Sequence, residues 1–384
     1  MSQSGVAYLI LRSNFDSLLA GLKQRGFLVV GPTVQEQAIV YDELGSTADL
    51  PTGWTDEQDG GTYRLKRRQD EALFGYNLGP HSFKKYLHPP STRLWKATVS
   101  ENGFDLSPEP VEKTRYAFVG VRSCELHAMA IQSRVFLDGP YTHTGYQERQ
   151  KNALTIAVNC GQAGKTCFCT SMGTGPKVTE GFDIAMTEVV ENGEHYFVAE
   201  AGTEEGQQVL EEMPHTEAGA AELQAAERQL AAAEQQMGLQ METAELRDLL
   251  IENMNHSRWD HVADRCLSCA NCTMVCPTCF CTTVEDVNDL TGENAERWQR
   301  WDSCFTMDFS YIHGGSVRPT TKARYRQWMT HKLATWHDQF DSSGCVGCGR
   351  CITWCPVGID ITEEVQAIRE SPENKGENNG SPDT

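Results

Sequence analysis

Short apolar runs separated by turn residues dominate the first hundred positions of the chain. Proline and glycine turns at 50–53 and 88–90 divide these runs. Such a pattern predicts a mixed α/β region. The clearest runs are VAYLILR (6–12), FLVVGP (27–32) and AIVYDEL (38–44).

Two later runs have the character of buried strands, with a cysteine just beyond each. Residues 116–121 (YAFVGV) and 154–158 (LTIAV) are nearly unbroken apolar stretches rich in β-branched side chains. Cys124 and Cys160 follow them closely. We therefore expect both thiols just past strand ends, where the side chains of α/β sheets converge on a crevice and ligands commonly bind.

From Thr216 to about Met254 the composition changes to alanine, glutamate, glutamine and leucine, which favours one or two long helices. Leu223, Leu230 and Met237 are seven residues apart. This spacing predicts a helix docked on its own domain, and a coiled coil is the alternative. The segment separates an N-terminal half from a cysteine-rich C-terminal half.

Charge and hydropathy narrow the possible functions. Of 384 residues, 33 are basic and 53 acidic, and the net charge of −20 disfavours binding to nucleic acids and anionic lipids. No stretch approaches the roughly 18 apolar residues that a membrane span needs, and the N-terminus lacks the basic segment of a signal peptide. We expect a soluble, cytoplasmic protein without a leader.

The 15 cysteines are the most informative residues of the chain. Their number is odd, so they cannot all form disulfides. Eleven of them follow position 265, bunched at short spacings at which neighbouring thiols face one centre more readily than they pair with each other. This bunching predicts metal binding.

Two of the cysteine runs match C-x-x-C-x-x-C-x-x-x-C-P, the pattern of bacterial ferredoxins. In that pattern three thiolates on a tight loop bind one [4Fe–4S] cluster, while the fourth cysteine reaches a second cluster. Zinc, the alternative, closes its site with two separated pairs and explains neither the third cysteine nor the repeated C-P. Crossed ligation predicts a first set of Cys266, Cys269, Cys272 and Cys355, and a second set of Cys345, Cys348, Cys351 and Cys276.

Four more cysteines lie in the N-terminal half and predict a third [4Fe–4S] cluster. Two of them form a C-x-C pair in a glycine-rich stretch whose backbone N–H groups suit cluster sulfurs, and the other two follow the predicted strands. The alternative is that they are ordinary buried cysteines. This third set is Cys124, Cys160, Cys167 and Cys169. The neighbouring Glu125 and His127 suit ligands, groups that support ligands, or surface residues equally well.

Cys279, Cys281 and Cys304 remain, one short of a set of four. We expect them to be core thiols or thiols that support a ligand. The sequence TCFCT, which contains the first two of them, occurs at both 166–170 and 278–282.

A basic stretch is unusual in so acidic a chain. We expect it to form a solvated helix face, and the alternatives are a docking patch or compensation for anionic clusters. Its residues are Arg318, Lys322, Arg324, Arg326 and Lys332.

These patterns together predict an α+β protein. An N-terminal mixed α/β domain (1–215) precedes a helical connector (216–255) and a ferredoxin-like dicluster domain (256–369), which carries a long helical insertion (277–344). Residues 370–384 are almost without apolar side chains, which predicts a disordered tail. No dinucleotide fingerprint, Walker loop, H-E-x-x-H or G-x-S-x-G motif occurs in a suitable place, so nucleotide, flavin and proteolytic chemistry are not predicted.

Further motifs accompany the cysteine runs along the chain. With those runs they are GFLVVGPT (26–33), DLPTGW (49–54), GTYRL (61–65), the segment 79–95, GVRSCELHA (120–128), TCFCTSMGTGP (166–176), the run 266–281, WDSCF (301–305) and the run 345–361. Through these motifs the chain resembles, over most of positions 5–365, the iron–sulfur beta subunits of cytoplasmic NAD(P)-linked [NiFe]-hydrogenases, also called sulfhydrogenase beta subunits. The A subunit of anaerobic sulfite reductase is close kin.

The resemblance implies an electron-transfer subunit that is not itself catalytic. Such a subunit relays single electrons through [4Fe–4S] clusters from a flavin- and NAD(P)H-binding subunit to the small and large hydrogenase subunits, which carry the nickel–iron site. The isolated chain is then expected to lack hydrogenase activity.

Three alternatives stay open at this point. An electron-transfer subunit of anaerobic sulfite reductase is the first, because the catalytic partner rather than this chain defines the reaction. A self-contained sulfur or disulfide reductase using Cys167/Cys169 or Cys279/Cys281 is the second, although the electropositive setting that activates a thiol is not evident from the sequence. A structural zinc protein is the third.

Overall fold

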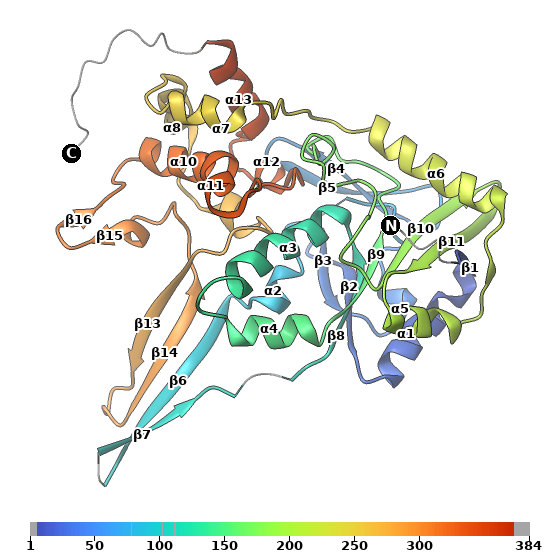
Figure 1. Ribbon diagram of the computed structural model, residues 1–384, viewed down its shortest axis with the longest axis horizontal. Helices are drawn as coiled ribbons and strands as arrows, with labels where there is room; N and C mark the ends of the chain where they lie inside the picture. The colour runs from blue at the N-terminus through green and yellow to red at the C-terminus, as the bar shows by residue number, and fades with distance from the viewer. Residues whose placement is uncertain (1–5, 78, 102, 111–112, 372–384) are drawn as a thin grey trace.

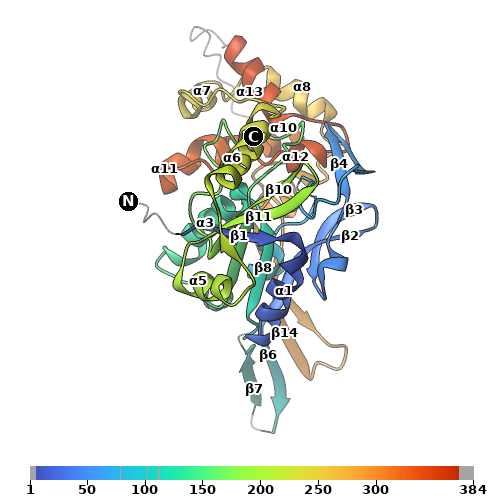
Figure 2. The same ribbon diagram turned by 90° about the vertical axis from the view of Figure 1, so that its right-hand side faces the viewer.

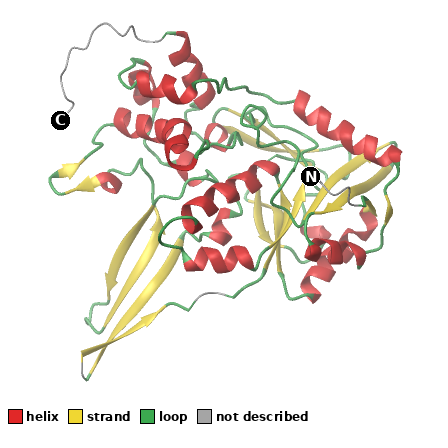
Figure 3. Cartoon of the chain, in the orientation of Figure 1, coloured by secondary structure: helices red, strands yellow, loops and turns green. Residues whose placement is uncertain are grey.

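The computed structural model describes residues 6–77, 79–101, 103–110 and 113–371. Figure 1 shows a large sheet flanked by helices, a narrow sheet that projects away from it, and a helical region formed by the later part of the chain. The mixed α/β organisation agrees with the prediction from sequence. Figure 3 shows that long loops connect many of these elements.

The large sheet has eight strands in the described part of the chain, in the order β12-β1-β11-β10-β9-β8-β2-β3. Its central strands β2, β8, β9 and β10 are parallel neighbours, and the outer pairs are antiparallel. The two buried strands predicted from sequence are β8 and β9, with the expected bounds. The strands are β1 (Tyr8–Leu11), β2 (Leu28–Gln35), β3 (Ala38–Glu43), β8 (Tyr116–Val121), β9 (Leu154–Val158), β10 (Ile184–Glu191), β11 (Glu194–Ala201) and β12 (Thr216–Glu217).

Helices cover both faces of this sheet, because successive side chains of a strand point to opposite sides. Val119 of β8 belongs to the core under α1 and α5, whereas its neighbour Phe118 belongs to the core under α3 and α4. Figure 2 shows α1 and α5 together beside the sheet. The covering helices are α1 (Phe15–Gln24), α3 (Ser123–Leu137), α4 (Thr144–Lys151) and α5 (Glu204–Glu211).

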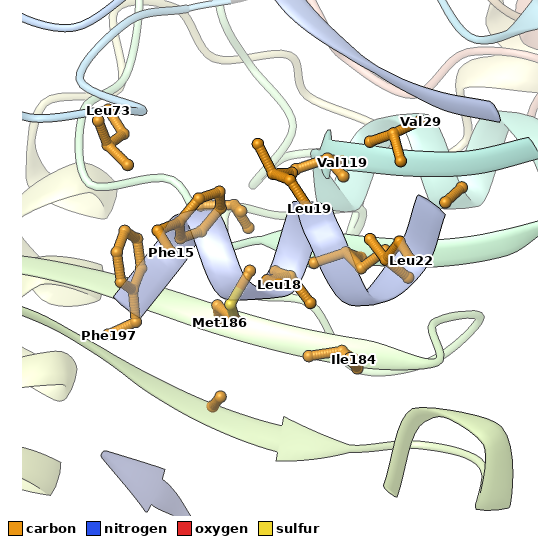
Figure 4. Packing of buried hydrophobic residues seen from close by; sticks show 14 of the residues in the cluster. Phe15, Leu18, Leu19, Leu22, Val29, Leu73, Val119, Ile184, Met186 and Phe197 are labelled. Carbon is orange, nitrogen blue, oxygen red and sulfur yellow. The ribbon is translucent and has the colours of Figure 1, made fainter. Parts of the chain in front are cut away.

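One face of α1 anchors the larger core. Its apolar side chains recur at the i, i+3, i+4 and i+7 spacing of an amphipathic helix, and each is at most 1% exposed. Figure 4 shows them against side chains of neighbouring strands, among them Val119, Met186 and Phe197. At roughly 1.5–3 kcal/mol for each buried side chain, this contact fixes the helix on the sheet. The four residues are Phe15, Leu18, Leu19 and Leu22.

The projecting sheet, which we call the arm, combines two hairpins from distant parts of the chain (Figure 1). Strand β14 pairs antiparallel with β6, so the insertion predicted at 277–344 begins with strands rather than helices. The strand sequences TTVEDVN and NAERWQRW contain β-branched and aromatic residues that favour extended chain. The arm consists of β6 (Ser91–Ser100), β7 (Gly103–Pro108), β13 (Thr282–Asn288) and β14 (Asn294–Trp301).

A smaller hairpin, β4 (Trp54–Asp59) with β5 (Thr62–Arg67), packs on the second cysteine run. The Gly61 N–H donates to the Ile352 carbonyl at 3.1 Å. Gly61 has φ +69°, and a Cβ there would lie 2.8 Å from the Cys355 carbonyl oxygen, so only glycine fits. Minor elements are α2 (Lys84–Leu87), β15 (Tyr311–Ile312), β16 (Gly315–Ser316) and the 3₁₀ turns η1 (Arg12–Asn14), η2 (Thr47–Asp49) and η3 (Asp308–Ser310).

Helix α6 (Ala220–Gln235) occupies the predicted connector. Its residues Ala225 and Ala226 pack on β10 and β11, while Leu223 stays 41% exposed. The helix is therefore docked on its own domain, as the sequence predicted. Among the helices of the described residues, none is both long and apolar enough to cross a lipid bilayer.

Short helices surround the two ferredoxin-like runs and share a core that includes Trp259, Leu333 and Ile361. Helix α13 extends to Glu370, the first residue of the predicted tail, and residues 372–384 of that tail lie outside the described residues. The elements are α7 (Leu246–Glu252), α8 (Arg258–Arg265), α9 (Asn271–Met274), α10 (Thr321–Thr330), the π-helix η4 (His331–Thr335), α11 (Trp336–Phe340), α12 (Arg350–Thr353) and α13 (Ile361–Glu370).

Candidate iron–sulfur sites

The first ferredoxin-like run forms a tight loop between α8 and α9. Ser268 and Ala270 adopt left-handed backbone conformations, with φ of 51° and 67°, which turn the chain sharply. The Ser268 N–H donates to the Cys266 sulfur at 3.4 Å. The loop lines a cavity of about 420 Å³, counting the part open to solvent, whose walls include Tyr325 and Trp328.

Cys355 reaches the same cavity from the second run. Helix α9 packs beside α12, and the Asn271 side chain donates to the Trp354 carbonyl at 3.3 Å. The Ile359 N–H donates to the Cys355 sulfur at 3.3 Å. The four cysteines of the first set therefore line one cavity: Cys266, Cys269, Cys272 and Cys355.

The second run repeats the loop with glycines at the two left-handed positions. Gly347 and Gly349 have φ of 63° and 74°, and the Gly347 N–H donates to the Cys345 sulfur at 3.4 Å. A Cβ on Gly347 would lie 2.6 Å from the Phe168 carbonyl oxygen. The second loop is thus packed tightly against the N-terminal TCFCT segment.

Cys276 lies near the cysteines of the second run and is 8% exposed. Burial first, and then the neighbouring sulfurs of Cys345, Cys348, Cys276 and Cys272, raise the pKa of the Cys351 thiol well above its usual value. Cys272 belongs to the first set, so the sulfurs of the two runs lie close to one another.

A buried lysine lies against this second set. The Lys332 Nζ donates to the Cys276 sulfur at 3.3 Å, to Thr278 Oγ1 at 2.9 Å and to the Gly344 carbonyl at 3.2 Å. A hydrogen bond from Cys279, together with the Lys332 charge, holds the pKa of Cys276 well below its usual value despite burial. The electropositive setting that was not evident from the sequence is therefore present.

The prediction of a solvated helix face for the basic stretch is wrong. Lys332 and Arg324 are each only 6% exposed. Arg324 donates to the carbonyl of Pro319 at 3.1 Å, and Arg326 donates to that of Met254 at 2.6 Å. Unpaired charges are too costly to bury, so these cations lie where carbonyls or thiolates satisfy them. Lys332 matches the alternative of compensation for anionic groups.

The third set also comes together. Cys124 lies in the first turn of α3, just after β8, and Cys160 follows β9, so the two parallel neighbouring strands place both thiols at one edge of the sheet. The C-x-C pair closes over them from the following loop. A cavity of about 370 Å³ is lined by Cys124, Cys160, Cys167 and Cys169, and by Cys348 of the second set.

Arg122 forms part of the wall of this third cavity. It is 1% exposed and donates to four backbone carbonyls, including those of Phe74 at 2.7 Å and Tyr76 at 3.0 Å. Its Nε is fully buried and has no hydrogen-bond partner among the described residues. A buried positive charge with a spare donor suits an anionic group in the cavity.

Glu125 is neither a surface residue nor free to bind a metal. It is 1% exposed, and its carboxylate accepts hydrogen bonds from Arg350 at 2.8 Å and from the Tyr41 hydroxyl at 2.6 Å. Burial raises the pKa of Cys348, an effect that the Arg350 charge opposes. The pair therefore joins the N-terminal domain to the second cysteine loop. His127 is half-buried.

Cys279, Cys281 and Cys304 line a separate cavity of about 320 Å³ together with Lys332. Hydrogen bonds from Cys304 lower the pKa of the Cys281 thiol to about 7.

The donor chemistry of the three predicted sets fits [4Fe–4S] clusters, which are held by four thiolates and supply one-electron redox chemistry when bound. Backbone N–H groups point at sulfurs of the first two sets, and buried cations lie beside the second and third. Burial raises the pKa of Cys167 to about 12, so that thiol would release a proton when it binds metal at neutral pH.

Sequence reasoning missed Lys84, Arg122 and Arg350, and it gave the role of Lys332 only as an alternative. These cations lie far along the chain from the groups that they satisfy: Arg350 and Glu125 are 225 positions apart. A signal was nevertheless present for Arg122 and Arg350, because each stands within two residues of a cysteine that was singled out.

A sequence family described as the 4Fe-4S dicluster domain matches residues 265–359 of the chain. The match includes both ferredoxin-like runs, from Cys266 to Cys355. The protein is thus an iron–sulfur protein with a C-terminal domain of the type that holds two [4Fe–4S] clusters.

Over a much longer stretch the chain is similar to sulfhydrogenase 2 subunit beta of Pyrococcus furiosus. The two are 31% identical over 315 residues, which are 80% of this chain and 90% of the relative. The chain belongs to the family of sulfhydrogenase beta subunits, as its motifs predicted. No solved structure matches the chain. Homology to a hydrogenase subunit and the dicluster domain both support a role in electron transfer.

Proposed function

We propose that the protein relays single electrons through [4Fe–4S] clusters between a flavin- and NAD(P)H-binding subunit and the small and large subunits of a [NiFe]-hydrogenase. One observation carries the proposal: the second cysteine run contributes a lining residue to the cavity of each of the other two sets. Cys351 of the second set also lines the first cavity, and Cys348 of the second set lines the third. Electron tunnelling falls steeply with distance, so sites with shared walls are what a relay needs.

The proposed ligands are those of crossed ligation together with the N-terminal set. Each set supplies four thiolates, the number that holds a [4Fe–4S] cluster. The sets are Cys266, Cys269, Cys272 and Cys355; Cys276, Cys345, Cys348 and Cys351; and Cys124, Cys160, Cys167 and Cys169.

The buried cations of this chain tune the relay in the proposal. A cluster held by four thiolates carries net negative charge, and nearby positive charge and hydrogen bonds raise its reduction potential. Lys332 supplies both to the second set, and Arg122 supplies charge to the third. The first set has only the backbone donors of Ser268 and Ile359 among the contacts described above.

The first set also contains Cys269, the one exposed cysteine of the described residues. Around it, Leu267 is 62% exposed and Val357 39% exposed. In the third set Cys124 and Cys169 are at most 7% exposed, and Cys160 and Cys167 are half-buried. This supports direct electron exchange between a partner subunit and the first set. The proposal includes a cytoplasmic location and the domain division 1–215, 216–255 and 256–369, and involves neither nucleic acid nor membrane.

The test replaces, one at a time, the two cysteines that crossed ligation assigns to the cluster of the other run. The variants are made in the full chain and reconstituted anaerobically. We expect Cys276→Ser and Cys355→Ser each to lose about 4 irons per chain. The Cys276→Ser protein should keep the spectroscopic signal of the first set, and Cys355→Ser that of the second. The opposite assignment would overturn crossed ligation, and colourless, zinc-loaded protein would overturn the relay itself.

The partner assignment has a separate test. An affinity-tagged chain, expressed in its native cells, should co-purify with a nickel–iron subunit pair and a flavin subunit. The complex should reduce NAD(P)⁺ with H₂, whereas the isolated chain should show no H₂ turnover. Co-purification with a sirohaem subunit would instead favour a sulfite reductase and contradict the hydrogenase assignment.

A further inference from the structure

Three cysteines at the base of the arm remain without an assigned role. The hairpin register pairs Thr282 with Trp301, so the residues just outside the hairpin must converge. The Asp302 N–H donates to the Cys281 carbonyl at 2.9 Å, and the thiols of Cys281 and Cys304 are in hydrogen-bond contact. The β13–β14 hairpin thus holds Cys281 and Cys304 close to each other.

The cavity beside them is lined by cysteines, as the first and third cavities are. Counting the parts open to solvent, the three measure about 320 Å³, 420 Å³ and 370 Å³ respectively. Trp328 forms part of both the wall of this cavity and the wall of the first cavity. The thiols of Cys276 and Cys279 are in hydrogen-bond contact, which links it to the second set. This space therefore adjoins two of the proposed clusters.

A histidine lines the same cavity and supplies a fourth donor. His331 is the first residue of the π-helix η4, and π-helical turns inside longer helices frequently occur at functional sites. The Gln339 side chain lies within reach of the His331 ring. Metal-binding histidines characteristically give one ring nitrogen to such a partner and the other to the metal.

Two buried lysines bracket the cavity and suit an anionic group within it. Lys332 is part of its wall. Lys84 is 6% exposed, donates at 3.1 Å to the carbonyls of both Cys276 and Cys279, and lies 3.8 Å from the ring centroid of Trp301. The two cations come from opposite halves of the chain.

The repeated TCFCT motif gives the two C-x-C pairs a common setting. In the copy at 166–170 the Thr166 hydroxyl contacts the Thr353 hydroxyl at 2.8 Å, and in the copy at 278–282 the Thr278 hydroxyl donates to the Gly344 carbonyl at 2.7 Å. Each threonine thereby ties its pair to the segment that carries the second cysteine run. Each pair then lines a thiol cavity.

We propose that Cys279, Cys281, Cys304 and His331 bind a fourth iron–sulfur cluster, of the [4Fe–4S] class, with three thiolates and one imidazole. The inference rests on the proposed function in so far as it takes the neighbouring sets to hold clusters. The three thiols give up their protons as they bind iron. A single zinc ion, the alternative, would need the four donors within about 2.0–2.3 Å of one point.

The test measures iron, acid-labile sulfide and zinc in the full chain after anaerobic reconstitution. We expect about 16 irons per chain, and a loss of about 4 irons with their sulfide in Cys304→Ala, while the signals of the other sets persist. His337→Ala is the matched control, because His337 is exposed on the adjoining helix, and it should lose none. Unchanged iron in Cys304→Ala, or zinc in place of iron, would overturn the fourth cluster.

A second measurement needs no destabilising variant. Pulsed EPR of the reduced wild-type chain should show a strongly coupled histidine nitrogen on one cluster. The coupling should vanish in His331→Cys, with iron content unchanged because a thiolate replaces the imidazole. Absence of the coupling in wild type would overturn His331 as a ligand. Failure of the proposed relay looks different, since it would leave wild type without any iron, and failure of the partner assignment would leave the iron content unchanged.

Discussion

The two ferredoxin-like loops have the same backbone shape but opposite environments. Leu267 in the first loop is 62% exposed, whereas its counterpart Val346 in the second is 2% exposed. Asn271 lies at the surface, whereas its counterpart Arg350 is 1% exposed and paired with Glu125. The spacing of the cysteines therefore determines the conformation of each loop. Contacts with distant parts of the chain determine which loop is exposed and which is buried.

The largest effect is expected when the ion pair that helps to bury the second loop is removed. Arg350→Ala should lower the free energy of unfolding by about 3–5 kcal/mol, because it leaves the Glu125 carboxylate buried without its cation. Urea unfolding followed by circular dichroism measures the loss. The matched variant Asn271→Ala, at the equivalent exposed position, should change stability by about 0.5 kcal/mol or less. Equal losses in the two variants would show that both loops are equally enclosed.

The next test uses the left-handed glycine of the buried loop. A Cβ on Gly349 would lie 2.4 Å from the Thr166 carbonyl oxygen, and its φ of +74° disfavours any side chain. Gly349→Ala should therefore cost about 2–4 kcal/mol, the sum of backbone strain and overpacking. A thermal melt that hardly moves would mean that the second loop is free to shift away from the 166–170 segment.

Iron release should also separate the loops. The first set includes the exposed Cys269, so a chelator should remove its iron about tenfold faster than the rest, equivalent to ~1.4 kcal/mol in barrier height. Absorbance of an iron–chelator complex follows both phases. The Cys269→Ser protein should lack the fast phase. A fast phase that persists in that variant would assign it to another set.

The smallest effect on stability is expected at the position of the exposed loop where an alanine has a left-handed backbone conformation. Ala270 has φ of 67°, a conformation that glycine adopts without strain. Ala270→Gly should raise the free energy of unfolding by up to about 1 kcal/mol and raise the melting midpoint slightly. This change in stability is opposite in sign to that expected for Gly349→Ala. A decrease would mean that the Ala270 methyl group contributes more through packing than the strain costs.

The spacing of residues within one segment was enough to predict the local structure of that segment. The cysteine runs predicted both loops, and strands β8 and β9 predicted that Cys124 and Cys160 lie side by side, because parallel neighbours end at one edge of the sheet. Burial of Lys332 could not be predicted in the same way, since its contact with Cys276 joins positions 56 residues apart. Such contacts depend on the packing of whole segments, which a pattern within one segment does not contain.

The arm shows the same limit and has a consequence for the whole molecule. Strand β14 completes its hydrogen bonding on β6, from the other half of the chain. A dicluster segment produced or transplanted alone would carry β14 as a bare edge, open to pairing with any other extended chain and so to aggregation. The two halves are therefore expected to fold as one unit, although their cysteine motifs are separate in the sequence.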